Sequence, residues 1–193
     1  MRNERTRYLI VPGWHGSEDD HWQSHWQRAL PNAARVEQSD WIAPQRADWI
    51  AELERAIRRD SGRVVLIAHS LGCVTVAAWA AQADRRTLAQ VAGALLVAPA
   101  DVERETCHEA LRNFAPIARQ TLPFPSVLVG SDNDQACAPQ RALALGRCWG
   151  AETVILPSAG HINVKSGHGA WDSGYRHLFR LQYLIDLQSR RRA

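Results

Sequence analysis

Near the middle of the chain lies the stretch Val64-Val65-Leu66-Ile67-Ala68-His69-Ser70-Leu71-Gly72. Its first residues are apolar and mostly β-branched, which is typical of a strand covered on both faces. Residues 71–83 are apolar nearly all round and indicate a helix buried against the centre of a sheet. A strand, a sharp turn and a helix in succession predict a nucleophile elbow, in which a strained turn lifts the Ser70 hydroxyl above the sheet.

Small residues two positions on either side of such a serine let the strand and the helix approach closely. Gly72 fits this requirement, and Ala68 departs from the G-x-S-x-G pattern by a single methyl group. An isolated x-S-x-G has a simpler interpretation, in which Ser70 is only the N-cap of the helix. The strand before the serine and the helix after it favour the nucleophile.

Short apolar runs alternate with helical patterns along the rest of the chain, which predicts an α/β fold with helices on both faces of a parallel sheet. Apolar residues at helical spacing indicate two surface helices around 22–30 and 50–57, and a last helix is expected at 175–188. About six mostly parallel strands are expected, at residues 8–11, 35–39 (a weak strand), 63–68, 92–98, 126–130 and 153–156.

Composition bounds the class of protein. The 193 residues fit one domain, 1–193, and 46% hydrophobic with 22% charged residues is the content of a globular chain. The net charge of +3 is small and spread out, so we expect no nucleic-acid partner. The four cysteines form no C-x-x-C pair and are expected to be reduced thiols.

Targeting signals are not evident in the sequence. No apolar run approaches the roughly 18 to 20 residues that cross a bilayer, so we expect no membrane association. The apolar run that follows the charged N-terminus is too short for the core of a signal peptide. We therefore expect a cytoplasmic location.

The partners that a nucleophilic serine needs follow later strands. Such a hydroxyl requires an adjacent imidazole, which is itself oriented by a carboxylate. Asp134 follows the strand at 126–130 and His161 the strand at 153–156, and loops at the carboxyl ends of parallel strands meet at one edge of the sheet. We expect Ser70, Asp134 and His161 to form a triad, with Asp132 in the same loop and Asp101 after an earlier strand as alternative acids.

Attack on a carbonyl also creates an oxyanion that needs hydrogen-bond donors. The turn offers the backbone N–H of Leu71, and the glycine-containing loop at residues 12–17 offers that of Trp14. The same loop also reads as a turn before a helix, with Ser17 as the cap. The two interpretations are compatible.

These motifs together resemble the small α/β-hydrolase family typified by YdeN and the retinoblastoma-binding serine hydrolase. The resemblance spans nearly the whole chain and rests on Pro12-Gly13-Trp14-His15-Gly16-Ser17, His21-Trp22 with Trp26, Ala68-His69-Ser70-Leu71-Gly72, Gly130-Ser131-Asp132-Asn133-Asp134, Gly160-His161-Ile162-Asn163 and Ser166-Gly167-His168-Gly169-Ala170-Trp171.

The resemblance implies a three-layer α/β-hydrolase fold with a Ser70, Asp134 and His161 triad. The interval of 27 residues between acid and base (161 − 134) matches the family and favours Asp134 over Asp132. It also implies a serine hydrolase or esterase that acts on small esters and needs no cofactor, with Asn163 and Trp171 bordering the site. One vertebrate relative is also discussed as a binding protein, so a protein-interaction module with vestigial catalysis is the alternative.

Two other site classes fit the sequence poorly. His21 and His25 have the spacing of an H-E-x-x-H zinc site, but Trp22 stands where its glutamate belongs, so we expect no metal. The loop at 12–16 is not G-x-G-x-x-G, and Lys165, the only lysine, lies far from any Walker position, so nucleotide binding is not expected.

The expected reaction is acyl transfer through an acyl-enzyme. Residues 101–123 leave room for about one helix, so the lid is expected to be minimal and the substrate a small ester or related acyl compound. The candidate pocket residues are Trp14, His15, Trp41, Asn163 and Trp171.

Overall fold

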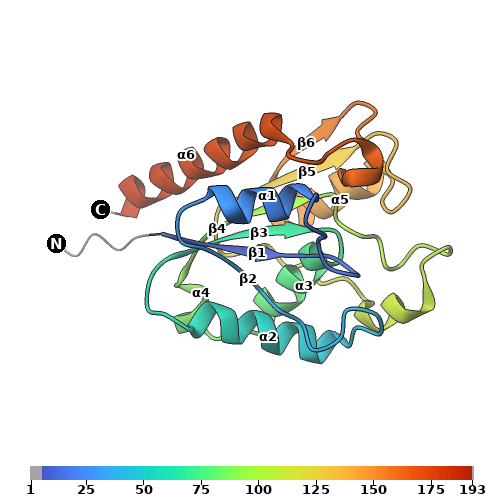
Figure 1. Cartoon of the computed structure of the whole chain (residues 1–193). Coiled ribbons are helices and arrows are strands. Elements are labelled where there is room, and N and C mark those ends of the chain that lie inside the picture. The colour runs from blue at the N-terminus through green and yellow to red at the C-terminus, as the bar shows by residue number, and fades with distance from the viewer. Residues whose placement is uncertain (1–5, 193) are drawn as a thin grey trace.

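A six-stranded parallel sheet forms the centre of the protein, as the computed structural model, which describes residues 6–192, shows (Figure 1). The strands lie in the order β2-β1-β3-β4-β5-β6, and every neighbouring pair is parallel. Their bounds are β1 (Arg7–Val11), β2 (Ala33–Arg35), β3 (Val64–His69), β4 (Val91–Val97), β5 (Ser126–Ser131) and β6 (Glu152–Leu156). The predicted α/β fold with about six parallel strands is confirmed.

Helices cover both faces of this sheet and make three layers. Figure 1 shows α1 and α6 above the sheet and α2 and α3 below it. The helices are α1 (Trp22–Ala29), α2 (Arg46–Arg58), α3 (Leu71–Ala80), α4 (Arg85–Leu88), α5 (Pro139–Trp149) and α6 (Tyr175–Arg192), with short 3-10 helices η1 (Glu109–Phe114), η2 (Val164–Ser166) and η3 (Asp172–Gly174).

The core lies in two apolar layers, one on each face of the sheet. In β3, Leu66 and Ala68 pack in the layer with α2, α3 and α5, whereas Val65 and Ile67 pack in the layer with α1 and α6. All residues of β3, β4 and β5 are buried. This two-sided burial explains why the strand sequences are nearly continuous apolar runs.

Several element boundaries differ from the sequence prediction, among them the start of α2, which lies at Arg46 rather than near residue 50. The weak strand predicted at 35–39 is wrong in position, because β2 covers Ala33–Arg35. Val36 still donates to the Ile10 carbonyl (2.9 Å), but the Asp40 carboxylate then binds the backbone N–H groups of two following residues and turns the chain away. Helix α3 ends at Ala80 rather than 83, and α6 extends past 188 to Arg192.

Helix α5 was not predicted, although its sequence carries the usual signals. Pro139 stands at the first helical position, and Gly150 ends the helix in the left-handed conformation (φ 67°). Ala142, Leu145 and Trp149 are buried and recur at helical spacing. The helix packs on β5 and β6, and so sets the position of the loops that follow those strands.

The connection between β4 and β5, where a small lid is expected, contains little regular structure. We call residues 98–125 the cap segment; its regular structure is the 3-10 helix η1. Glu103 holds it together, because its carboxylate accepts from the Ile117 N–H (2.8 Å) and pairs with Arg119 (2.9 Å) and with Arg141 of α5. The cap segment is therefore tied to the body of the protein.

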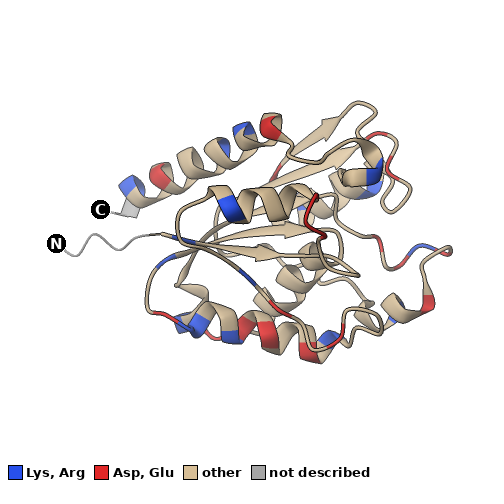
Figure 2. Ribbon diagram, viewed as in Figure 1, with Lys and Arg blue, Asp and Glu red and all other residues tan. Residues whose placement is uncertain are grey.

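Charged residues are spread over the surface helices, and the cysteines form no disulfides within the described residues. Figure 2 shows positive and negative residues interspersed along α2 and α6. The four cysteines are free. Within residues 6–192, no helix combines the length and apolar character needed to cross a membrane. The signal-peptide and one-domain predictions fall partly on residues 1–5 and 193, outside the described residues.

Candidate active site

Ser70 lies at the tight turn between β3 and α3, and its backbone is strained. Its φ of 53° and ψ of −120° fall in a region that residues with a side chain rarely adopt. The turn also brings the chain close to the end of β1. A Cβ added at Gly72 would lie 2.3 Å from the Val11 carbonyl oxygen, so only glycine fits there. The buried Ala68 methyl is accommodated in the core.

The Ser70 hydroxyl does not cap the helix that follows it. Ser70 occupies the N-cap position of α3, but its side chain makes no capping hydrogen bond. Its Oγ instead lies 2.9 Å from His161 Nε2. The strained backbone therefore directs the hydroxyl towards an imidazole.

Asp134 holds the other side of the His161 ring. His161 Nδ1 lies 2.9 Å and 3.0 Å from the two carboxylate oxygens of Asp134, whose side chain is only 1% exposed. A carboxylate can only accept, so Nδ1 carries the ring proton, and Nε2 of the neutral ring is left to accept from the Ser70 hydroxyl. This arrangement can make a serine nucleophilic.

The loops that carry the acid and the base bind each other directly. We call residues 131–134 the acid loop and residues 157–163 the base loop. Three successive N–H groups of the base loop donate to side chains of the acid loop: Ser158 to Asp132 Oδ1 (2.7 Å), Ala159 to Ser131 Oγ (3.0 Å) and Gly160 to Asn133 Oδ1 (2.7 Å). Ser158 and Gly160 have positive φ values (49° and 56°), so these bonds hold an unusual backbone.

The two alternative acids have other partners. Asp132 accepts from the Ser158 N–H of the base loop and, within residues 6–192, makes no hydrogen bond to the His161 ring. Asp101 accepts from the Glu103 N–H (3.1 Å) and lies 3.3 Å from Arg141. Among the three aspartates considered, Asp134 is the one that bonds to His161.

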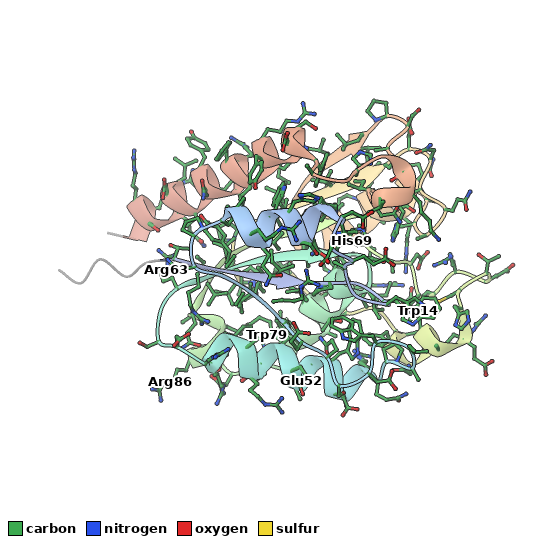
Figure 3. All side chains as sticks on the ribbon, in the orientation of Figure 1. Trp14, Glu52, Arg63, His69, Trp79 and Arg86 are labelled. Atoms are coloured by element: carbon green, nitrogen blue, oxygen red, sulfur yellow. The ribbon has the colours of Figure 1, made fainter. Side chains whose placement is uncertain are left out.

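The predicted oxyanion donors lie on the two segments that meet at Ser70. Leu71 is the first residue of α3, where backbone N–H groups have no partner within the helix. Trp14 follows Gly13, and a Cβ added at Gly13 would lie 2.7 Å from the Ser70 Cβ. Neither the Leu71 nor the Trp14 N–H donates a hydrogen bond within the described residues. Figure 3 shows Trp14 in this region.

The candidate pocket residues separate into two groups. Trp14, His15 and Asn163 line one cavity of about 160 Å³ between the loop after β1 and the segment after His161. Trp41 packs beneath Gly16 instead, with its ring about 3.6 Å from where a Cβ there would lie.

Trp171 is a core residue rather than part of the cavity wall. It is buried, with its ring edge-on to Trp22 (5.2 Å between centroids) and stacked on Trp26 (5.8 Å). The sequence motif that contains Trp171 therefore contributes to packing under α1. The structure does not bring this side chain to the cavity lined by His15 and Asn163.

His21 caps a helix. Its Nδ1 accepts from the Gln23 N–H (3.2 Å) at the start of α1, and burial, with Arg35 nearby, lowers the pKa of His21 to about 4. In residues 6–192 no group of three or more side chains of the usual ligand types is placed to hold a metal ion.

His69 is a site residue whose role the sequence did not indicate. It precedes Ser70 and is buried, and its Nε2 lies 2.9 Å from the His161 carbonyl oxygen. Only its position inside the elbow motif singles it out in the sequence. Figure 3 shows it at the same end of the sheet as Trp14.

Comparison with known proteins gives one matching sequence family and many similar structures. Residues 8–180 match a family described as serine hydrolase. A YdeN-like hydrolase from Pectobacterium atrosepticum is 31% identical, with a TM-score of 0.79 over 95% of this chain and 92% of its own. None of the curated protein sequences compared with the chain matches it.

More distant structures share the fold. The ydeN gene product of B. subtilis is 17% identical, with a TM-score of 0.72 over 93% of this chain and 99% of its own. The esterase domain of a Rhodothermus marinus protein is 15% identical, with a TM-score of 0.66 over 94% of this chain and 89% of its own. These similarities extend over nearly the whole of each chain.

Proposed function

Because the chain belongs to the serine hydrolase family that includes the YdeN-like hydrolases, we propose that it hydrolyses small esters or related acyl compounds with Ser70 as nucleophile. The observation that carries this proposal is the 2.9 Å contact between Ser70 Oγ and His161 Nε2 at a strained turn. A serine that served only as a helix cap would not need that strain.

The proposed first step forms an acyl-enzyme. His161 Nε2 takes the proton of the Ser70 hydroxyl as Oγ attacks the substrate carbonyl, and the carboxylate of Asp134 stabilises the imidazolium that results. The tetrahedral intermediate collapses when its bond to the leaving alcohol breaks, and His161 gives the proton to that alcohol. Ser70 is then esterified.

The second step repeats this chemistry with water. His161 removes a proton from the attacking water, and the second tetrahedral intermediate releases the carboxylic acid as the proton returns to Ser70 Oγ. We assign the Leu71 and Trp14 N–H groups to the oxyanion of both intermediates, because neither has a hydrogen-bond partner among residues 6–192 and both lie on the segments that meet at Ser70.

The proposal of a small substrate rests on the cap segment and the cavity. The cap segment carries one six-residue 3-10 helix, which is too little to enclose a long acyl chain. The cavity lined by Trp14, His15 and Asn163 measures about 160 Å³, which is smaller than the roughly 300 to 1,000 Å³ of most ligand pockets. We therefore expect acetate and butyrate esters to react faster than octanoate esters.

Active-site labelling tests the proposal. A fluorophosphonate probe should modify the wild-type protein and the Ser189→Ala variant, which changes an exposed serine on α6. Ser70→Ala and His161→Ala should not be labelled, and both should lose several orders of magnitude in the hydrolysis of p-nitrophenyl acetate. Well-folded wild-type protein that fails to react would instead favour a binding role.

A further inference from the structure

His69 precedes the nucleophile in sequence and contacts the segment that carries the base. Side chains alternate along β3, so His69 shares a face with Ile67, on the side of the sheet that α1 covers. There its Nε2 lies 2.9 Å from the carbonyl oxygen of His161. One residue that adjoins Ser70 in sequence therefore contacts the main chain of His161.

The chemistry of this contact defines the state of the His69 ring. A carbonyl oxygen only accepts, so Nε2 of His69 must carry a proton and donate it. Burial lowers the pKa of His69 well below its ordinary value, so the ring is neutral and Nδ1 is unprotonated. The rings of His21 (4.9 Å between centroids) and Trp22 (5.9 Å) pack edge-on against it and restrict its rotation.

The base loop needs such support because its backbone is unusual on both sides of His161. Gly160 has a φ of 56° and Ile162 a φ of 47°. The Ile162 carbonyl is held by the Trp22 indole N–H (2.9 Å), next to the carbonyl that His69 holds. Two buried donors, the His69 ring and the Trp22 indole, thus anchor successive carbonyls of the base loop.

We propose that His69 is a positioning residue for His161: its Nε2–H fixes the His161 carbonyl, so that the imidazole meets Asp134 and Ser70 at the same time. The expected effect of His69 on kcat rests on the proposed function, whereas the positioning of the His161 ring can be measured without turnover. The acid loop holds the N–H groups of the base loop, and His69 holds the carbonyl of the base itself.

Three variants separate positioning from general stability. His69→Gln keeps an N–H donor near the place of Nε2, whereas His69→Leu removes it at similar size. His177→Leu is the matched control, because His177 is a buried histidine on α6 whose Nε2 has no hydrogen-bond partner in the described residues. With p-nitrophenyl acetate, His69→Leu should lower kcat about 10- to 100-fold with little change in KM, because small misplacements of catalytic groups have effects of this size.

His69→Gln should recover most of the lost kcat, and His177→Leu should keep the wild-type value. A purely structural role of His69 would lower the thermal stability of His69→Leu and leave the kcat of the folded protein unchanged. Equal losses of kcat in His69→Gln and His69→Leu would overturn the proposal.

Long-range proton–nitrogen NMR correlations of the histidine rings provide a readout that needs no substrate. In the wild-type protein His69 should be protonated at Nε2 and His161 at Nδ1. His161 should keep that tautomer in His69→Gln and show a mixture of tautomers in His69→Leu. Protonation of wild-type His69 at Nδ1 would overturn the proposal even if His69→Leu did not fold. If the wild-type protein shows these tautomers but its Ser70 does not react with the fluorophosphonate probe, the proposed hydrolase is contradicted and the positioning role of His69 is not.

Discussion

Replacing Asp134 with asparagine tests the triad through the proton of His161. Asp134 Oδ1 also accepts from the Ala136 N–H (2.8 Å), so the amide oxygen of an asparagine would keep that bond and turn its NH2 group towards His161. His161 Nδ1 would then have to accept, and the ring proton would move to Nε2. A protonated Nε2, 2.9 Å from Ser70 Oγ, cannot take the hydroxyl proton.

The expected loss is therefore large although the geometry barely changes. An amide in place of the triad acid lowers kcat by about 10⁴-fold in a serine protease. That factor corresponds to about 5 kcal/mol of transition-state stabilisation. Steady-state hydrolysis of p-nitrophenyl acetate measures it, and the thermal unfolding temperature of Asp134→Asn should stay near that of the wild type.

Asp132→Asn is the matched control from the same loop. Its amide oxygen can still accept from the Ser158 N–H, so the base loop keeps its support and kcat should stay within about twofold of the wild type. Asp134 is not the triad acid if Asp134→Asn retains more than a tenth of the wild-type kcat, or if Asp132→Asn is the more damaging change.

Three further predictions concern packing, pH and thiols. Gly72→Ala should destabilise the protein by about 1 to 3 kcal/mol in urea unfolding, because its methyl would meet the Val11 carbonyl; unchanged stability contradicts the close approach. The pKa of His21 falls from 6.5 to about 4 in the folded protein, so the ring stays neutral there over a pH range in which it is protonated in the unfolded chain. About 3 kcal/mol of folding stability should therefore be lost as the pH drops from 6.5 to 4. His21→Asn keeps a capping side chain and should flatten that loss. Iodoacetamide should modify the partly exposed Cys148 before Cys137, because burial raises the pKa of Cys137 to about 12; mass spectrometry of the modified peptides gives the order.

Much of the fold could be predicted because the strands of this sheet are covered on both faces. An apolar run such as β4 is too short for a typical helix and has no polar residues for an exposed face, so its sequence indicates a strand buried on both faces. The edge strand β2 lacks this constraint. Its position depends on pairing with β1 and on the turn that Asp40 makes, neither of which a local pattern encodes.

The candidate site was predictable to the extent that chain order and sheet direction place groups together. Ser70, Asp134 and His161 each follow a strand at its carboxyl end, so their meeting could be inferred without side-chain detail. The supporting contacts could not. The bond from His69 to a main-chain carbonyl depends on the exact path of a loop 92 residues further along the chain.

For Trp171 the sequence suggested a role at the site that the structure does not show. Its place in a motif near His161 suggested a pocket wall, but eight tryptophans in one chain also have to fill space, and this one completes a stack with Trp26. Nearness in sequence to a catalytic group does not determine which face of the backbone a large side chain takes. The Trp171 side chain takes the face on which it is buried against α1.

The left-handed backbone of Ser70 has a consequence for evolution and engineering. Glycine adopts such a conformation readily, so Ser70→Gly should raise the melting temperature, whereas Ser70→Ala keeps a Cβ and the strain with it. An enzyme that no longer needed its hydroxyl would gain about 1 kcal/mol by this one exchange. The serine stands at a position where stability alone would select its removal.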